Sequence, residues 1–274
     1  MTADPRTYIP KSSRPKLGRY TVSCPIAPLH RKPNIKSGLE TQLLFGQYFD
    51  VYKLNKKWAW GQSLTPVKGS RQKGYVGYVP LKCFEQDVIS ANYVVTGLRA
   101  PLFSNANIKS AITRFLHLGA RLKAKKVSAQ FLQLVSGEYV HVNHVRSLRK
   151  CPLVVDFVDI AERHKGLPYV WGGVSSDGLD CSGLVQSSLR AVGRDAPRDA
   201  DMQQGQLGRH LPIRQSGLKR GDLIFWKGHV GIMTSAVNMV HANAFHMCVE
   251  TEPLREAIKR IQASGGDVTA IKRL

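Results

Sequence analysis

Three patterns are missing from this 274-residue sequence. No apolar run reaches the roughly 18 residues that a membrane-spanning helix needs, which argues against a helical membrane protein. The first twenty residues are polar and contain prolines, without the apolar core of a secretory signal. A cytoplasmic protein is therefore expected, provided that no export signal precedes them. The five cysteines are an odd number without tight pairing, which is typical of free thiols in a reducing compartment.

Acidic residues are also scarce, with 19 Asp and Glu against 40 Lys and Arg and a net charge of +21. Such a charge attracts nucleic acid, anionic membrane or anionic cell-wall material. The basic residues form short clusters rather than a long block, so we interpret them as solvated faces and expect no specific nucleic-acid partner. With 43% hydrophobic and 22% charged residues, the chain has the composition of a globular protein of two or three domains.

A glycine-rich loop that leads into a helix runs from Tyr169 to Gly183. The helix is predicted by apolar residues that share one face, namely Leu184, Val185, Leu189 and Val192. Asp180 suits the N-cap position, and Gly193 suits the end of the helix. Cys181 would then lie at the positive end of the helix dipole, a setting that lowers a thiol pKa and favours a nucleophilic thiolate.

A nucleophilic cysteine needs a base, and two histidines follow on predicted strands. The expected elements are a hairpin strand 223–226, a turn 227–228, a strand 229–234 and a third strand 238–241. His229 and His241 would face the helix start from adjacent strands. One imidazole would take the thiol proton, and the other would orient the first imidazole. His246 is the nearest competitor for the orienting role and is interpreted as a surface strand residue.

A zinc site built from Cys, His and His is the metal alternative. Zinc accepts those ligands, but its sites usually contain closely spaced ligand pairs, and none accompanies Cys181. His141 and His144 are closely spaced but have no companion cysteine pair. We therefore expect neither a metal nor a cofactor.

The sequence resembles the NlpC/P60 family of papain-like cysteine peptidases, which cut bacterial cell-wall peptides. The matching segments are Tyr169-Val-Trp-Gly-Gly, Asp180-Cys-Ser-Gly-Leu-Val, Arg220-Gly-Asp-Leu-Ile-Phe, His229-Val-Gly-Ile and Val240-His-Ala. The resemblance implies a catalytic triad of Cys181, His229 and His241. It also implies that Tyr169 lies near the oxyanion and that Asp180 and Ser182 hold the substrate.

An internal repeat precedes this region. Ala27-Pro-Leu and Asn34-Ile-Lys-Ser recur 73 residues later as Ala100-Pro-Leu and Asn107-Ile-Lys-Ser. A fixed offset indicates two copies of one unit. Short predicted strands fill both copies, at 48–52, 58–60, 75–79, 120–124, 131–135 and 139–142. The pattern resembles bacterial SH3-like domains, with Gly74 to Pro80 as the closing signature.

The first copy carries an aromatic cluster, Trp58, Trp60, Tyr75 and Tyr78, of which we expect about half to be structural because strand residues alternate between the two faces. In proteins that the sequence resembles, the first barrel walls the active site with an aromatic and an acidic residue that meet the free N-terminus of the substrate. Tyr75 or Tyr78 is the candidate aromatic.

The acidic partner is harder to place, because no Asp or Glu occurs between Lys53 and Phe84. Glu85, Asp87 and Asp50 remain open as substitutes.

The expected fold is multidomain, with two small all-β SH3-like barrels followed by an α+β papain-like domain. The boundaries are a basic polar arm at 1–19, barrels at 20–90 and 91–149, and the peptidase domain at 150–274. A linker at 150–155 and a short helix at 156–163 open the last domain.

The resemblance implies acyl transfer on a peptidoglycan peptide, cut between the γ-carboxyl of D-glutamate and a diamino acid, meso-diaminopimelate or L-lysine. Two barrels and no visible signal favour recycling of muropeptides with a free N-terminal L-alanine. The alternatives are a secreted hydrolase of intact wall, an acyltransferase or amidase, and a non-catalytic protein that binds wall or nucleic acid. The diamino acid and the oligomeric state stay open.

Overall fold

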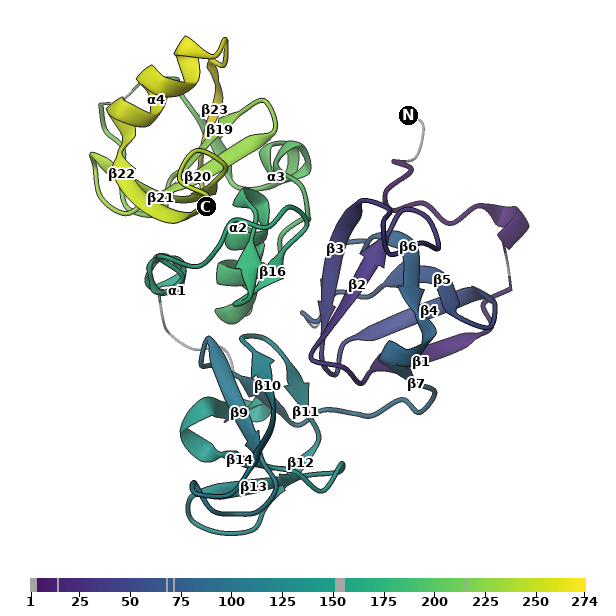
Figure 1. Ribbon diagram of the computed structural model, residues 1–274. Coiled ribbons are helices and arrows are strands. Elements are labelled where there is room, and N and C mark those ends of the chain that lie inside the picture. Colours follow the sequence, from purple (N-terminus) through teal and green to yellow (C-terminus); the bar gives the residue numbers. More distant parts are fainter. Residues whose placement is uncertain (1–3, 14, 68, 71, 151–155, 215) are drawn as a thin grey trace. The chain divides into compact units, whose positions relative to one another are not determined.

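The computed structural model describes residues 4–13, 15–67, 69–70, 72–150, 156–214 and 216–274. The chain divides into two compact units, Met1–Leu153 and Val154–Leu274, which are described separately here (Figure 1). Cys151 and most of the expected linker lie outside the described residues. Within the described residues, no helix combines the length and apolar character needed to cross a membrane.

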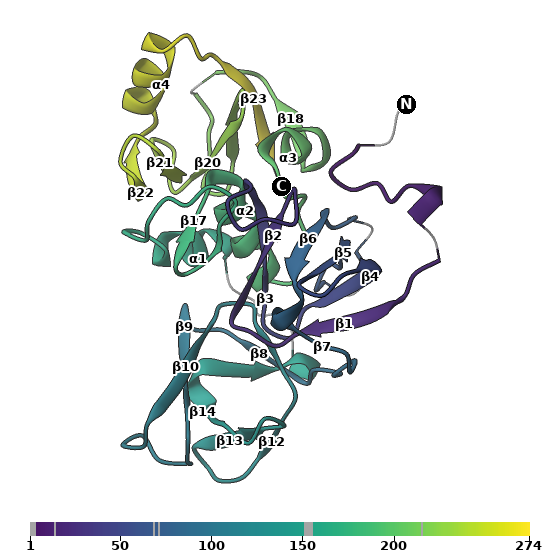
Figure 2. The same ribbon diagram turned by 45° about the vertical axis from the view of Figure 1, so that its right-hand side comes forward.

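The N-terminal part of the first unit is a seven-stranded antiparallel sheet in the order β3-β2-β6-β5-β4-β1-β7 (Figure 2). Its elements are η1 Lys11–Ser13, β1 Gly18–Val22, β2 Ile26–His30, β3 Leu39–Leu44, β4 Tyr48–Leu54, β5 Trp58–Ser63, β6 Val76–Pro80, η2 Leu81–Cys83 and β7 Phe84–Glu85. Inward residues of different strands, such as Val22, Leu29 and Phe49, are fully buried and form the core.

The rest of the first unit holds a five-stranded sheet, β10-β9-β14-β13-β12, and a three-stranded sheet, β11-β8-β15. The elements are β8 Tyr93–Val95, β9 Arg99–Phe103, β10 Ile112–His117, β11 Arg121–Leu122, β12 Ala124–Lys126, β13 Phe131–Leu134, β14 Tyr139–His141, η3 Val142–His144, β15 Val145–Ser147 and η4 Leu148–Lys150. Both sheets contribute to one apolar core, which includes Val95, Leu102 and Leu116.

The predicted internal repeat is confirmed down to the strand register. Ala27 pairs with Leu43 between β2 and β3, and Ala100 pairs with Leu116 between β9 and β10, each 73 residues further on. Both hairpins carry a register irregularity at the equivalent position. Gly46 and Gly119 occupy the same place after the hairpin with positive φ angles of 76° and 89°, which glycine adopts without steric cost.

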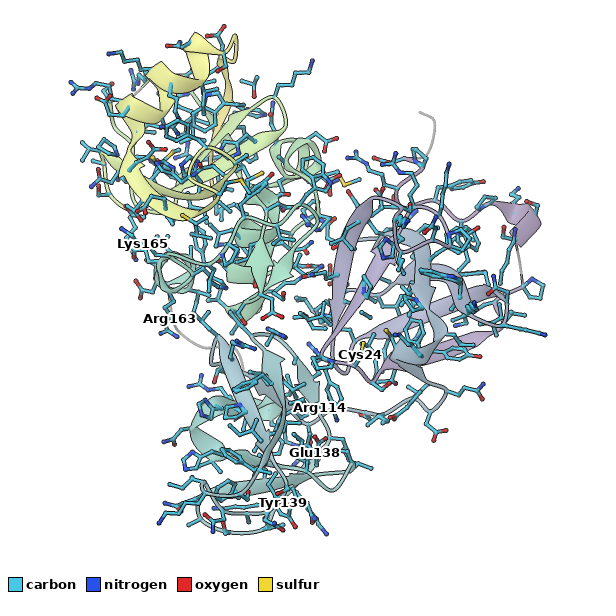
Figure 3. The ribbon with its side chains drawn as sticks, in the orientation of Figure 1. Cys24, Arg114, Glu138, Tyr139, Arg163 and Lys165 are labelled. Carbon is cyan, nitrogen blue, oxygen red and sulfur yellow. The ribbon has the colours of Figure 1, made fainter. Side chains whose placement is uncertain are left out.

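Arg114 of β10 connects the two parts of the first unit. Its guanidinium donates to Glu138 at 2.5 Å and to the backbone oxygen of Ser23 at 2.8 Å, and it stacks over the Phe45 ring (Figure 3). A cleft of about 260 Å³ lies beside this contact, lined in part by Arg121 and Lys123. None of the candidate catalytic residues lines this cleft.

The second unit is built on a six-stranded sheet, β18-β23-β19-β20-β21-β22. The strands are β18 Arg209–Leu211, β19 Leu223–Trp226, β20 His229–Met233, β21 Asn238–Asn243, β22 Cys248–Pro253 and β23 Val268–Arg273, and a small hairpin is formed by β16 Val174–Ser175 and β17 Gly178–Leu179. The helices are α1 Phe157–Arg163, α2 Cys181–Ala191, α3 Ala200–Gln206 and α4 Leu254–Ala263.

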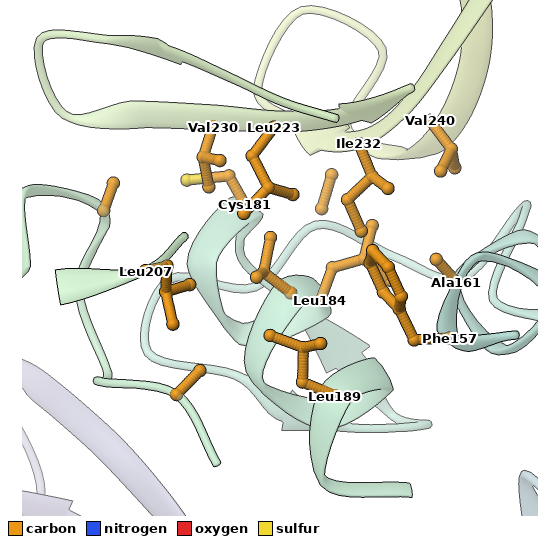
Figure 4. Packing of buried hydrophobic residues seen from close by; sticks show 14 of the residues in the cluster. Phe157, Ala161, Cys181, Leu184, Leu189, Leu207, Leu223, Val230, Ile232 and Val240 are labelled. Atoms are coloured by element: carbon orange, nitrogen blue, oxygen red, sulfur yellow. The ribbon is translucent and has the colours of Figure 1, made fainter. Parts of the chain in front are cut away.

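Two apolar layers lie on opposite faces of this sheet. Along β19, Leu223 and Phe225 pack with α1 and α2, whereas Ile224 and Trp226 pack with α4. Figure 4 shows Leu184 and Leu189 of α2 directed into the first layer, with Cys181 at its edge beside Val230. The sheet therefore packs against α2, whose N-terminus lies at the turn between β19 and β20.

The local predictions for this unit are confirmed. The expected helices correspond to α2 and to α1, for which Asp156 is the N-cap. The hairpin turns at Lys227 and Gly228, where Trp226 pairs with His229. Sequence reasoning did not identify the other elements of this unit, namely α3, α4, β16, β17, β18, β22 and β23.

Candidate active site

Cys181 is the first residue of α2, and Asp180 is the N-cap as predicted. The Asp180 carboxylate accepts a hydrogen bond from the backbone N–H of Gly183 at 2.7 Å and another from Gly172 at 2.9 Å. One side chain thus satisfies a free amide of the helix and fixes the loop before it. The thiol therefore lies at a helix end whose position is set by the first turn of α2 and by the loop before it.

Two glycines allow this loop to contact the helix. A Cβ atom on Gly183 would lie 2.1 Å from the carbonyl oxygen of Gly173, and one on Gly173 would lie 2.4 Å from that of Gly178. Neither distance is possible for a side chain. These glycines of the Trp-Gly-Gly and Cys-Ser-Gly segments are therefore required for the close approach of two backbones.

Beneath Cys181 lies a buried ion pair that sequence reasoning missed. Arg198 donates to Asp180 at 2.8 and 2.6 Å and to the Ser182 hydroxyl at 3.0 Å. Ser182 in turn donates to Asp180 at 3.2 Å. All three residues are buried. The side chains of Asp180 and Ser182, expected to hold substrate, are thus engaged inside the fold. Nothing in the sequence around Arg198 marks it as their partner.

The Cys181 sulfur lies against the turn that carries His229. Its Sγ atom is 3.9 Å from the carbonyl oxygen of Gly228, and the N–H of Val230 also bonds to it. These are the two chain neighbours of His229. The fold therefore places the predicted nucleophile against the backbone on either side of the predicted base, although 47 residues separate Cys181 and Gly228.

Burial, followed by the charge of Asp180, raises the pKa of the Cys181 thiol to about 12. The expected lowering by the helix N-terminus is therefore wrong. The amides of Val230 and Ser182 and the charge of Arg198 do favour the thiolate, but desolvation outweighs them. At neutral pH the sulfur rests as a thiol, so reaction requires a base to remove its proton.

His229 on β20 and His241 on β21 are joined directly, with Nε2 of His229 2.8 Å from Nδ1 of His241. The expected pairing of the two rings is thus present. Burial, and then the charges of His241 and Arg260, lower the pKa of His229 to about 3. Burial also lowers the pKa of His241. Both rings are therefore neutral at physiological pH.

Glu252 on β22 extends this pair and was not identified from sequence. Its Oε1 atom lies 2.7 Å from Nε2 of His241, and Arg260 of α4 donates to the two carboxylate oxygens at 2.5 and 2.6 Å. Burial opposes ionisation of Glu252, but the hydrogen bonds from Arg260 and His241 outweigh it and lower its pKa to about 2.

Among the described residues, His241, His246 and Glu252 bring ligand atoms within 4.8 Å of one another, a donor set that zinc accepts. This set includes neither Cys181 nor His229, so it is not the alternative considered from sequence. The Glu252 carboxylate is already bound by Arg260, whose charge opposes a cation there. His246 lies in the turn after β21 rather than on a strand, and its ring contacts Asn243.

Tyr169 is half-buried against the apolar layer of α2, and burial, with the charges of Cys181 and Asp180, raises its pKa to about 12. The phenol therefore keeps its proton at neutral pH and can donate a hydrogen bond beside the thiol. In the first unit, Tyr75 is only 3% exposed, so burial makes it a core residue, whereas Tyr78 is half-buried on β6.

The three acids left open for the first barrel have different surroundings. Asp50 is buried and bound by Arg19 at 2.7 Å. Glu85 and Asp87 are exposed.

Comparison with known proteins agrees with this geometry. Residues 166–263 match the NlpC/P60 family, and residues 29–83 match the bacterial dipeptidyl-peptidase SH3 domain. The gamma-D-glutamyl-L-lysine dipeptidyl-peptidase of Bacillus subtilis is 28% identical over 238 residues, which cover 80% of this chain and 77% of that protein. Dipeptidyl-peptidase 6 of Lysinibacillus sphaericus is 24% identical over 80% of this chain and 85% of that protein.

A solved NlpC/P60 family protein from Bacillus cereus has the same fold, with a TM-score of 0.77 and 21% identity over 93% of this chain and 99% of that one. A probable endopeptidase of Corynebacterium glutamicum is 36% identical, but over only 31% of this chain and 41% of that protein. The chain therefore carries an NlpC/P60 cysteine peptidase domain of papain-like fold and, ahead of it, an SH3-like domain of the bacterial dipeptidyl-peptidase type.

Proposed function

We propose that the protein hydrolyses the bond between γ-D-glutamate and a diamino acid in short peptidoglycan peptides that begin with a free L-alanine. The observation that carries this proposal is the extent of the similarity. Relatives named as dipeptidyl-peptidases align over 80% of the chain, which extends well beyond the peptidase unit Val154–Leu274, whereas the probable endopeptidase aligns over 31%. The substrate class therefore follows the relatives that align over most of the chain.

In the proposed mechanism, His229 accepts the proton of Cys181 as the sulfur attacks the γ-amide carbonyl. The carbonyl oxygen becomes an oxyanion that backbone amides at the start of α2 and the Tyr169 hydroxyl stabilise. The protonated His229 then gives its proton to the leaving amine, and the C–N bond breaks. Water, deprotonated by His229, releases the acyl group and restores the thiol. His241 orients His229 throughout.

We also propose that residues 91–149 form a second SH3-like barrel. The repeated register of β2–β3 in β9–β10 supports this assignment. So do equivalent turn hydrogen bonds, from Gly46 to Val22 and from Gly119 to Val95. A chain in which both barrels precede the peptidase favours trimming of short muropeptides in cytoplasmic recycling over digestion of intact wall.

Mass spectrometry of six reactions, two peptides with three forms of the enzyme, tests the substrate. The tripeptides L-Ala-γ-D-Glu-L-Lys and L-Ala-γ-D-Glu-meso-diaminopimelate are incubated with the wild type, with Cys181→Ala, and with Cys248→Ala as a control for a half-buried thiol on β22. Release of L-Ala-γ-D-Glu by the wild type and Cys248→Ala alone supports the proposal. Comparing the two tripeptides identifies the diamino acid.

An N-acetylated copy of the preferred tripeptide distinguishes the proposed dipeptidyl-peptidase from the main alternative, an endopeptidase of intact wall. A dipeptidyl-peptidase spares the blocked copy, and equal cleavage of both copies would instead indicate an endopeptidase of wall. Cleavage of neither peptide by the wild type would contradict the proposed substrate.

A further inference from the structure

The two histidines and Glu252 form a continuous chain of hydrogen bonds that ends at a permanent positive charge. The links are His229 Nε2 to His241 Nδ1 at 2.8 Å and His241 Nε2 to Glu252 Oε1 at 2.7 Å. Arg260 then binds both carboxylate oxygens. His241 is 1% exposed, so neither of its ring nitrogens has water as an alternative partner. The order of donors and acceptors along this chain is therefore fixed from its acidic end.

The assignment begins at Glu252. A carboxylate held by Arg260 only accepts hydrogen bonds, so His241 must donate to it from Nε2. A neutral imidazole carries one N–H, which leaves Nδ1 of His241 as an acceptor. His229 must then donate to it from Nε2. Since His229 is neutral as well, its own Nδ1 is left with a free lone pair. Nδ1 is therefore the ring atom that can take a proton from the thiol.

We propose that Glu252 is a positioning residue that sets the tautomer of His241 and, through it, that of His229. The proposal rests on the proposed function, in which His229 is the base for Cys181. Without the carboxylate, His241 is free to carry its proton on Nδ1. Its Nδ1–H would then donate a hydrogen bond to Nε2 of His229. His229 would then accept there and carry its proton on Nδ1, and it could not deprotonate Cys181.

A purely structural role predicts different behaviour. Glu252 and Arg260 also connect β22 to α4, so their ion pair stabilises the packing of that helix. If this were the only role, Arg260→Met would be as damaging as Glu252→Met. If Glu252 acts through His241, Arg260→Met leaves the acceptor in place and is the milder change.

Four variants separate the two roles. Glu252→Met keeps the length of the side chain but removes the acceptor, Glu252→Gln restores one oxygen, and Arg260→Met removes the anchor. Glu250→Met is the matched control, since Glu250 lies on the same strand but binds Lys165 at 2.8 Å. Ring nitrogen NMR of the histidines reports the tautomers. The rate at which iodoacetamide alkylates Cys181, followed by peptide mass spectrometry, reports how well the base removes the thiol proton, and it needs no peptide substrate.

Glu252→Met is expected to slow alkylation of Cys181 and lower kcat by about 10- to 100-fold, as loss of an orienting partner does for metal-bound histidines, with little change in KM. Its NMR spectrum should show that His241 has lost its single Nε2–H form. Glu252→Gln should recover most of the rate, and Glu250→Met should match the wild type.

Unchanged alkylation and unchanged ring tautomers in Glu252→Met would overturn the proposal. Equal damage in Arg260→Met without recovery in Glu252→Gln would also overturn it, in favour of the structural role. A wild type that cleaves neither tripeptide would contradict the proposed substrate alone, because alkylation and NMR still test the role of Glu252.

Discussion

Arg198 and Asp180 form a buried ion pair next to the predicted nucleophile Cys181, with guanidinium and carboxylate 2.6 Å apart and both side chains at most 10% exposed. Asp180 is also the N-cap of α2, whose first residue is Cys181. The ion pair therefore neutralises the buried carboxylate that fixes the start of this helix. An isolated carboxylate at this depth would be strongly disfavoured, because burial penalises an unpaired charge.

Replacing Arg198 by Met should therefore destabilise the second unit by about 3 to 5 kcal/mol, the usual cost of breaking a buried pair. Urea unfolding followed by circular dichroism measures the loss. Arg194→Met is the control, since Arg194 is exposed four residues earlier and should change stability by no more than about 0.5 kcal/mol. Equal stability of the two variants would show that the pair does not support the fold.

Gly183→Ala should destabilise the fold by about 1 to 3 kcal/mol and lower turnover, because the added Cβ would overlap the carbonyl oxygen of Gly173. Gly205→Ala is the matched control. Gly205 also lies in a helix, but a Cβ there meets nothing within 4 Å, so it should raise stability by about 0.5 to 1 kcal/mol. Melting temperatures and tripeptide cleavage check both expectations, and a Gly183→Ala variant as active as the wild type would contradict them.

Activity should persist well into acid. The proposed mechanism needs His229 unprotonated in the free enzyme, and burial lowers the pKa of this ring to about 3, so the proposed base stays unprotonated as the pH falls below 6.5. We expect the acidic limb of kcat/KM to lie several pH units below that of an exposed histidine. Initial rates from pH 3 to 8, over the range in which circular dichroism shows a folded protein, measure it. A limb near pH 6.5 would contradict a buried, neutral base.

His164 should make stability depend on pH. It is 1% exposed, its Nδ1 lies 2.7 Å from the carbonyl oxygen of Ile160, and burial lowers its pKa. Because its folded pKa lies below its unfolded value, the stabilisation is present above pH 6.5 and is lost as the pH falls toward the folded pKa. His164→Gln should flatten the slope of stability against pH in this window by up to about 1.4 kcal/mol per pH unit.

Urea unfolding at pH 7, 6 and 5 gives this slope. His210→Gln provides the control, since His210 is exposed on β18 and its loss should leave the slope unchanged. An unaltered slope in His164→Gln would show that this histidine is not held neutral by the fold.

The sequence could predict the parts of the site that local spacing encodes. The N-cap at Asp180, the helix after it and the hairpin before His229 each depend on residues within one turn or one pair of strands. Arg198 and Glu252 could not be found this way. Each meets its partner through tertiary packing, and an arginine before α3 or a glutamate on a strand has no local pattern that distinguishes it from a surface charge.

The prediction of a lowered pKa for the Cys181 thiol was wrong for a related reason. A helix N-terminus is visible in sequence, but the desolvation that outweighs it depends on how deeply Cys181 sits against Val230, which only the folded sheet determines. The repeat in the first unit shows the opposite case. Short matching segments were enough, because they coincide with the hairpin whose register is repeated.

That repeated hairpin shows one backbone arrangement carried by two different sets of side chains. Backbone hydrogen bonds have kept their places across the 73-residue offset, while most side chains around them differ. Pairing at the bulge and a left-handed glycine after it constrain the chain whatever the neighbouring residues are. Side chains on the surface of either copy can therefore differ without changing the backbone pairing of the hairpin, so the two copies can present different surfaces on the same frame.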